Sequence, residues 1–151
     1  MARIWSVLAG TKSRQWKRFQ DELLITIGYP SLDAGDLSKY EDLNELRIAV
    51  GALPRARKHK MLWAFAKEMQ IGDLVVVPND DGILGYGVIA SDYRYVDHGV
   101  ENTFCHERGV EWYSCDGLEW HGASLTNNAI SLWDHSRNGP SNSMHLKDLI
   151  N

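Results

Sequence analysis

The sequence contains no long apolar run and very few cysteines. No stretch approaches the roughly 18–20 apolar residues that a membrane span needs. The N-terminal segment, MARIWSVLAG, lacks the apolar block and cleavage site of a signal peptide. Cys105 and Cys115 are too few for a disulfide framework, which favours free thiols. We therefore expect a cytoplasmic protein without a membrane partner.

Motifs that would indicate a nucleotide-processing enzyme are also missing. There is no G-x-x-x-x-G-K-[ST] phosphate loop, no G-x-G-x-x-G fingerprint and no G-x-S-x-G nucleophile elbow. Cys105, His106, Cys115 and His121 are close in the sequence but form no C-x-x-C or H-x-x-x-H pair. We therefore expect no metal site, no cofactor and no catalytic residue.

The length and composition are those of one globular domain. The chain has 151 residues, of which 44% are hydrophobic and 24% charged. Helix and strand patterns are interspersed, and the C-terminal half is mostly β. This predicts an α+β fold, a curled mixed sheet or small barrel with two to three helices packed outside it. We expect residues 1–151 to form a single domain, which could be the N-terminal part of a longer protein.

Hydrophobic periodicity predicts the elements along the chain. Ser38 and Glu41 read as a capping box, which predicts that a helix begins near Lys39. Other helices are expected over 13–23 and from near the basic segment 55–60 onward. The expected strands cover 4–10, 23–28, 71–78, 83–96 and 108–114, with a last element in 131–135 or 144–150.

Basic residues are concentrated in two short segments. KSRQWKR (12–18) and RARKHK (55–60) hold half of the 16 Lys and Arg residues, although the net charge is −4. An uneven charge pattern can create a local anion-binding surface on an acidic chain. The alternative is that these segments are two solvated helix ends.

Aromatic residues are abundant, with six tryptophans. Tyr29 stands between Gly28 and Pro30, where a strand is expected to end and a loop to begin. Val110 and Trp112 should share one face of their strand because side chains alternate along a strand. Two such rings could form the walls of a slot for a flat base, since stacking is favourable by ~1–3 kcal/mol per base. Alternatively, Trp112 fills the core.

Five segments in this order carry a resemblance to a known family: IWSV, IGYPSLDAGDLSKY, LWAFAKEMQIGDLVVVP, ILGYGVIASDYRY and HERGVEWY. Together they resemble the EVE domain of the PUA-like superfamily, a relative of the YTH domain, over roughly residues 3–115. The pattern is most similar to the N-terminal recognition domain of McrB-type, modification-dependent restriction systems. In these systems the domain precedes an AAA+ GTPase motor that works with a separate nuclease subunit.

The resemblance implies that the domain binds double-stranded DNA by flipping a modified base into an aromatic cage. The modified base would be a methylated or hydroxymethylated cytosine or a methyladenine. The implied cage residues are Tyr29, Trp112 and Trp120, and the implied base-edge contacts are Thr11, Ser13, Ser31 and Asp33. The candidate phosphate contacts, taken from the basic segments, are Lys12, Arg14, Lys58 and Lys60. Replacing Tyr29 or Trp112 by alanine is expected to abolish base preference and to leave the fold intact.

Three other interpretations remain open at this stage. The same scaffold could bind RNA. A small enzyme acting on a nucleotide would need a titratable group facing the rings, for which Glu111, Asp33 and Asp92 are the candidates. The chain could also be an interaction domain whose tryptophans all belong to the core.

Overall fold

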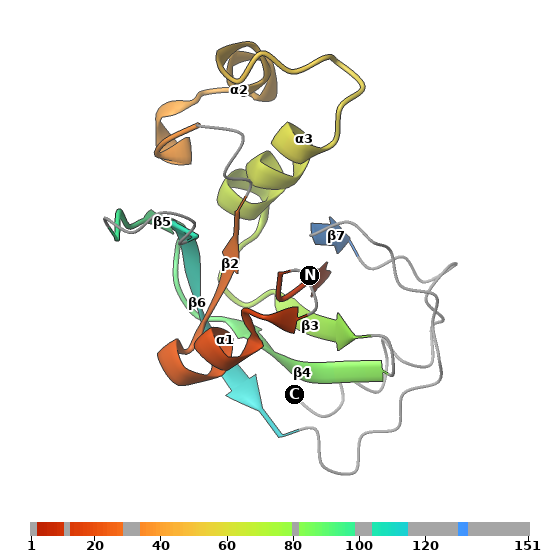
Figure 1. Cartoon of the computed structure of the whole chain (residues 1–151). Helices are drawn as coiled ribbons and strands as arrows, with labels where there is room; N and C mark the ends of the chain where they lie inside the picture. Colours follow the sequence, from red (N-terminus) through yellow and green to blue (C-terminus); the bar gives the residue numbers. More distant parts are fainter. Residues whose placement is uncertain are drawn as a thin grey trace.

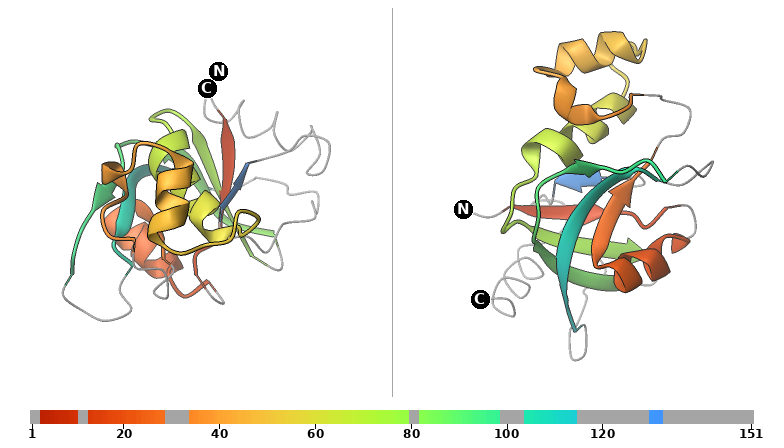
Figure 2. Two further views of the ribbon diagram at one scale, coloured as in Figure 1. Left: turned by 90° about the horizontal axis from the view of Figure 1, so that it is seen from above. Right: turned by 90° about the vertical axis from the view of Figure 1, so that its left-hand side faces the viewer.

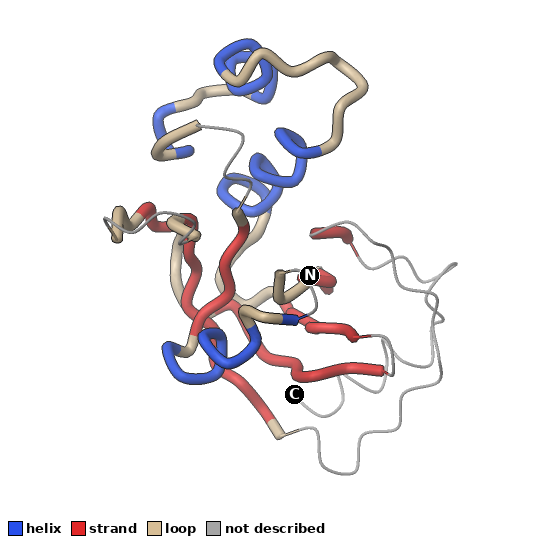
Figure 3. Tube along the Cα trace, viewed as in Figure 1, coloured by secondary structure: helices blue, strands red, loops and turns tan. Residues whose placement is uncertain are grey.

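The computed structural model describes residues 3–10, 13–28, 34–79, 82–98, 104–114 and 130–132 (Figure 1). In this part of the chain, strands form one mixed sheet that helices accompany, which confirms the expected α+β class (Figure 3). The strands are β1 Ile4–Val7, β2 Leu24–Ile27, β3 Leu74–Asn79, β4 Gly82–Ile89, β5 Arg94–Tyr95, β6 His106–Tyr113 and β7 Ile130–Leu132. The helices are α1 Trp16–Glu22, the 3-10 helix η2 Leu37–Lys39, α2 Leu43–Ala49, α3 Lys58–Trp63 and the π-helix η3 Ala64–Glu68. No helix within the described ranges is long and apolar enough to cross a membrane.

The sheet is strongly curled (Figure 2). Its strand order is β2-β6-β4-β3-β1-β7, and the short β5 adds to β6. β1 and β3 run parallel with Ile4 opposite Leu74, whereas the other pairs are antiparallel. The pairing of β2 with β6 brings Ile27 opposite His106. This pair marks the end of the sheet at which the predicted loop after β2 begins.

Side chains on the two faces of the sheet enter different apolar clusters. Trp5 and Val75 belong to the larger cluster, whereas their neighbours Ile4 and Leu74 belong to a smaller one on the other face. Helix residues join the larger cluster, among them the fully buried Phe19, Leu46, Leu62 and Phe65. The continuous burial along β1 and β3 therefore reflects a sheet that is covered on both faces.

The helix start after β2 differs from the prediction. Ser38 does not cap a helix. Instead its amide and hydroxyl both donate to the carboxylate of Asp36, which caps the start of η2. The carboxylate of Asp42 accepts the Glu45 amide at 2.7 Å and caps α2. Glu45 in turn accepts the Glu41 amide at 3.2 Å. The S-x-x-E prediction was wrong because two aspartates, each with a carboxylate in cap position, outcompete the serine.

The third helix changes from α to π geometry at Ala64, and a buried arginine of β6 holds its end. The Arg108 guanidinium donates to the carbonyl oxygens of Phe65 at 2.6 Å and Met69 at 2.9 Å, and to that of Ala66 at 3.1 Å. These carbonyls would otherwise lack partners at the end of the helix. Arg108 thereby fastens the helices to the middle of the sheet.

The helices η2, α2, α3 and η3, residues 34–69, form a helical arm that stands above the sheet in Figure 1 and in the right-hand view of Figure 2. At its base, Lys67 donates to the Ser38 carbonyl at 3.1 Å, and the carboxylate of Asp73 accepts the Gln70 amide at 3.0 Å. Asp73 also accepts the indole N–H of Trp5 at 2.9 Å. The arm is therefore connected by hydrogen bonds to β1 as well as to β6.

Candidate functional site

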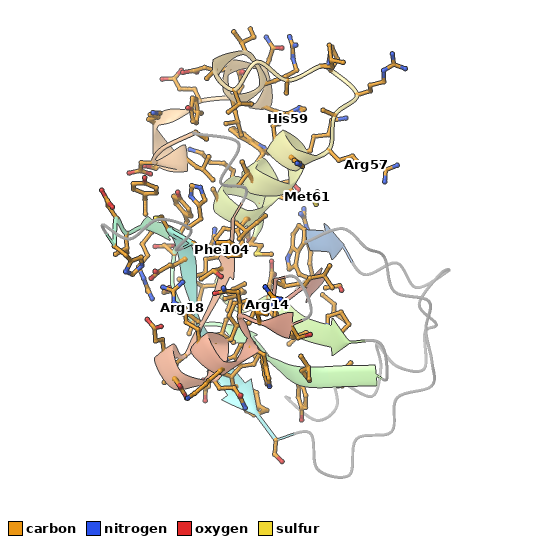
Figure 4. All side chains as sticks on the ribbon, viewed as in Figure 1. Arg14, Arg18, Arg57, His59, Met61 and Phe104 are labelled. Carbon is orange, nitrogen blue, oxygen red and sulfur yellow. The ribbon has the colours of Figure 1, made fainter. Side chains whose placement is uncertain are left out.

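A concave surface with several charged side chains around it lies between α1 and Phe104. This α1 depression has a volume of about 430 Å³. Its lining residues are Arg14, Gln15, Lys17, Arg18, Asp21, Glu22 and Phe104. Figure 4 shows Arg14 and Arg18 beside Phe104. Its volume falls within the roughly 300–1,000 Å³ of ligand-binding clefts.

Phe104 is held in place by the backbone of Gly28. A Cβ atom on Gly28 would collide with the Phe104 ring, so only glycine permits the observed approach. Gly28 follows β2 directly, and Phe104 lies two residues before β6. The ends of the β2–β6 pair therefore bring an aromatic ring next to the residue that precedes Tyr29.

Arg18 connects the depression to a buried carboxylate. Its guanidinium donates to Glu107 at 2.6 Å, to the Phe104 carbonyl at 3.0 Å and to Glu22 at 2.8 Å. Arg94 and His98 also bond Glu107, at 3.2 and 2.7 Å. Burial disfavours the carboxylate, but the hydrogen bonds from His98, Arg18 and Arg94 hold the pKa of Glu107 below its usual range.

The cationic side of the depression thus consists of one fixed and two exposed groups. Arg18 is fixed by its bonds to Glu22, Glu107 and the Phe104 carbonyl, whereas Arg14 and Lys17 are exposed. Lys17 pairs with Asp21 at 2.6 Å, which is an exposed i,i+4 pair of the kind that is worth only a few tenths of a kcal/mol. Both exposed cations can therefore turn toward an anion such as a phosphate at little cost.

A second aromatic group lies at the same end of the sheet. The Tyr93 hydroxyl accepts the Leu37 amide at 3.1 Å and donates to Nδ1 of His106 at 2.7 Å. Burial lowers the pKa of His106 to about 4, so its imidazole is neutral and Nδ1 can accept this bond. Burial also raises the pKa of Tyr93, which stays a phenol. Tyr95, 38% exposed, packs on His106 with ring centroids 5.5 Å apart.

The structure describes five of the predicted site residues, namely Ser13, Arg14, Lys58, Lys60 and Trp112. The others lie outside the described residues: Thr11, Lys12, Tyr29, Ser31, Asp33 and Trp120. Ser13 precedes α1 with a left-handed backbone, φ +59°, that is uncommon for a non-glycine residue. Arg14 lines the α1 depression two residues before α1 begins.

Trp112 packs against α1. Its ring stacks on Phe19 with an interplanar angle of 13° and meets Trp16 edge-on at 5.2 Å. Its indole N–H donates to the Phe19 carbonyl at 2.9 Å. At least one face of this ring is therefore covered within the chain. Val110 and Trp112 belong to one apolar cluster and Tyr113 to the other, which confirms the predicted alternation along β6.

Lys58 and Lys60 belong to a different element from Arg14. Both are exposed on α3, while His59 between them is buried. Figure 4 shows this part of α3 away from Arg14 and Arg18. The predicted phosphate contacts are thus divided between α1 and the helical arm, rather than gathered in one patch.

Of the three residues considered for catalysis, the structure describes Glu111 and Asp92. Glu111 is exposed on β6, and Asp92 is exposed in the turn before β5. No group of three His, Cys, Asp or Glu side chains there could hold a metal ion.

Sequence reasoning missed Phe104, Arg18 and Tyr95. The only local signal for Phe104 is that an aromatic residue stands just before the strand HERGVEWY, and its partner Gly28 is 76 positions away. The roles of Arg18 and Tyr95 likewise depend on residues of β6 that are distant in sequence. Pairing of β2 with β6 brings these groups together, and strand pairing is not encoded in any short motif.

Comparison with known proteins assigns the family. A family model described as a domain of unknown function, DUF8426, matches residues 5–131. The chain belongs to this family. The DUF8426 match covers β1 through most of β7, and so includes the α1 depression and the helical arm. No curated protein matches the chain. In this DUF8426 protein the curled mixed sheet with helices is compatible with a PUA-like fold.

Proposed function

We propose that the protein binds double-stranded DNA carrying a modified base, which it flips out of the helix into an aromatic site. The observation that supports this most directly is the α1 depression, in which the Phe104 ring lies beside Arg14, Lys17 and Arg18. Stacking surface next to exposed cations is the combination that an unstacked nucleotide requires, because the base needs a π face and its phosphates need positive charge.

In the proposed mechanism, Arg14 and Lys17 contact phosphates next to the extruded nucleotide. Tyr29 supplies a stacking face, and Phe104 fixes the backbone at Gly28 just before it. Backbone that is fixed before binding lowers the entropy cost of ordering the site. Extrusion of a base costs a few kcal/mol, which stacking and phosphate neutralisation together can offset. One methyl group contributes at most ~1–3 kcal/mol of discrimination, so preference should be partial.

The biological setting that we propose is a McrB-type restriction system. A recognition domain without its own chemistry needs a motor and a nuclease, and these would be an AAA+ GTPase and a separate subunit. The proposal extends the sequence resemblance to the EVE domain, with which the observed curled sheet is compatible. In this setting the protein is a binding module and not an enzyme.

The decisive experiment is a binding titration with short duplexes that differ by one modified base. Fluorescence anisotropy at two salt concentrations gives the affinity and the salt dependence for each duplex. We expect one modification to bind several-fold more tightly than the unmodified duplex. Equal affinity for all duplexes would contradict the proposal, and tighter binding to the same sequence as RNA would favour an RNA-binding module instead.

A matched pair of charge variants tests the role of the α1 depression. Arg14→Ala with Lys17→Ala should weaken binding to every duplex and reduce the slope of log K against log salt by about 0.9 per lost phosphate contact. Arg3→Ala is the control, because Arg3 is exposed beside β1, three strands away from β6 in the sheet. A change of base preference in the α1 variant would mean that these cations do not act as phosphate contacts.

A further inference from the structure

The helical arm carries a concentration of positive charge that the depression does not use. Residues 46–67 contain six Lys or Arg residues and no Asp or Glu. Because the whole chain has a net charge of −4 and this segment contributes +6, the remainder carries −10. Arg55, Arg57 and Lys60 are exposed, and none of them forms an ion pair in the described part of the chain.

An exposed leucine stands within this basic segment. Leu53 is 67% exposed, and Pro54 and Arg55 beside it are exposed as well. Single exposed apolar residues are common on protein surfaces. Leu53 differs from most of them because it is placed in a connecting loop, residues 51–57, with arginines directly after it.

The 51–57 loop is fixed by hydrogen bonds on both sides of Leu53. The amides of Gly51 and Ala52 donate to the carbonyls of Ile48 and Arg47 at 3.1 and 3.0 Å, which ends α2 in a Schellman motif. Gly51 has φ +67°, the left-handed backbone that this motif needs.

Two further bonds complete the loop. The Ala56 amide donates to the Leu53 carbonyl at 3.0 Å, in a turn with Pro54 at its second position. The Arg47 side chain donates to the Ala52 carbonyl at 3.2 Å. The loop therefore presents Leu53 in one conformation, so that little entropy is lost when a partner binds it.

The chemistry of the loop fits duplex DNA. Proteins that bend or unstack DNA insert Leu, Ile, Phe, Met or Pro side chains between base steps, and nearby cations hold the phosphates. A continuous polyanion matches a segment with six cations and no carboxylate. An apolar protein surface would match Leu53 but would leave Arg55 and Arg57 without a counter-charge.

We infer that the 51–57 loop is a second DNA contact, in which Arg55 and Arg57 bind phosphates and Leu53 inserts at a base step. This inference rests on the proposed function, because base flipping provides an unstacked step for an apolar side chain to occupy. It adds a separate element to that function, since the loop belongs to the arm and not to the α1 depression.

Leu53→Ala is the central test, with Ile48→Ala as its control. Ile48 is 63% exposed on α2, so both substitutions remove a similar exposed aliphatic group from the arm. The probe is a duplex with 2-aminopurine next to the modified base, whose fluorescence rises when its neighbours unstack. Leu53→Ala should lower affinity about tenfold and reduce the fluorescence rise at saturating protein, since insertion compensates for unstacking and keeps the step open. Ile48→Ala should leave both unchanged.

Arg55→Ala with Arg57→Ala tests the phosphate contacts of the loop. This pair should weaken binding to modified and unmodified duplexes alike and lower the salt slope, while the fluorescence rise persists at saturating protein. A salt slope identical to that of the wild type would overturn the assignment of these arginines.

The remaining outcomes separate the loop from the proposed function. If Leu53→Ala matches the wild type while the wild type prefers a modified duplex, the insertion is wrong and the reader function stands. If the wild type binds no duplex, both are overturned. If Leu53 is instead needed for binding to vesicles rich in phosphatidylserine, and duplexes do not bind, the arm is a membrane contact and the inference is also overturned.

Discussion

Phe104 occupies the space where a side chain on Gly28 would stand, so these two residues pack as a unit although they are far apart in sequence. Gly28→Ala should displace the Phe104 ring, reshape the α1 depression and weaken binding to modified duplexes. The added methyl group also strains the β2–β6 end, and overpacking of this kind costs about 1–3 kcal/mol. Urea unfolding and anisotropy titration measure the two effects.

A double-mutant cycle isolates this contact. In the Phe104→Ala background the methyl group has room, so Gly28→Ala should cost much less stability there than in the wild type. Equal costs in both backgrounds would show that the two residues do not act on each other.

Trp112 should behave as a packing residue as well as a candidate cage wall. Its stacking on Phe19 and its bond to the Phe19 carbonyl imply that Trp112→Ala destabilises the protein by about 3 kcal/mol. This prediction differs from the expectation from sequence that the alanine variant leaves the fold intact. Trp112→Phe keeps a stacking ring and loses one hydrogen bond, worth about 1 kcal/mol.

Binding measured with the folded Trp112→Phe variant therefore separates the two roles. A preserved base preference in Trp112→Phe, together with its loss in Tyr29→Ala, would assign recognition to Tyr29. Unchanged unfolding of Trp112→Ala would contradict the packing role.

Arg108 should be among the positions least tolerant of substitution. It is 3% exposed and donates to three carbonyls at the end of η3 and to the Ser91 carbonyl at 3.2 Å. Lysine keeps the charge but cannot match the planar donor geometry, so Arg108→Lys should lower the free energy of unfolding by about 3 kcal/mol. Arg94→Lys is the control; its side chain is 43% exposed, and the expected change is under about 1 kcal/mol. Similar unfolding midpoints for the two variants would refute the role of Arg108.

The buried His106 predicts loss of stability in mild acid. Burial lowers its pKa from 6.5 to about 4, and the negative charge of Asp36 opposes this shift only in part. The unfolded chain therefore takes up a proton at higher pH than the folded protein does. Stability is complete above about pH 6.5 and falls as the pH approaches 4, by about 2 kcal/mol between pH 7 and pH 5.

His106→Gln provides the comparison for this pH effect, because glutamine can still accept the Tyr93 hydroxyl and does not titrate. Burial lowers the pKa of His59 too, followed by the charges of Lys60 and Arg47, so some pH dependence should remain in the variant. The difference between the two urea-unfolding profiles over pH 5–7 reports His106 alone. Parallel profiles would contradict its neutral state.

The sequence was sufficient for the α+β class because periodicity and turn residues are local. The strands over 71–78 and 108–114 correspond closely to β3, a continuous apolar run, and to β6, where Val110 and Trp112 alternate with Glu111 and Tyr113. The predicted strand 83–96 is interrupted between β4 and β5, although its composition stays favourable. The helix start near Lys39 was wrong because three oxygen-bearing side chains compete within a few positions, and only backbone geometry decides between them.

The site was less predictable because its contacts join distant segments. Nothing local to Arg108 indicates that it binds carbonyls of η3, and nothing local to Glu107 indicates its bonds to Arg18, Arg94 and His98. The parallel pairing of β1 with β3 is equally hidden, since neither short apolar strand carries a signal for its partner. The order of the motifs indicated a family resemblance. Which side chains surround the depression, by contrast, depends on how the strands pair, and the sequence did not predict that pairing.

The separation of charge between residues 46–67 and the rest of the chain has a consequence for the first moments of an encounter. At physiological salt, electrostatic forces reach only about 8 Å, which is less than the width of this domain. A nucleic acid that approaches residues 46–67 is attracted by their net charge of +6, whereas the rest of the chain, with its net −10, attracts it only locally, at the cations of the α1 depression. Collisions should therefore be productive mainly when one of these two cationic surfaces leads, so that the polarity of the molecule selects its landing orientation before any base is inspected.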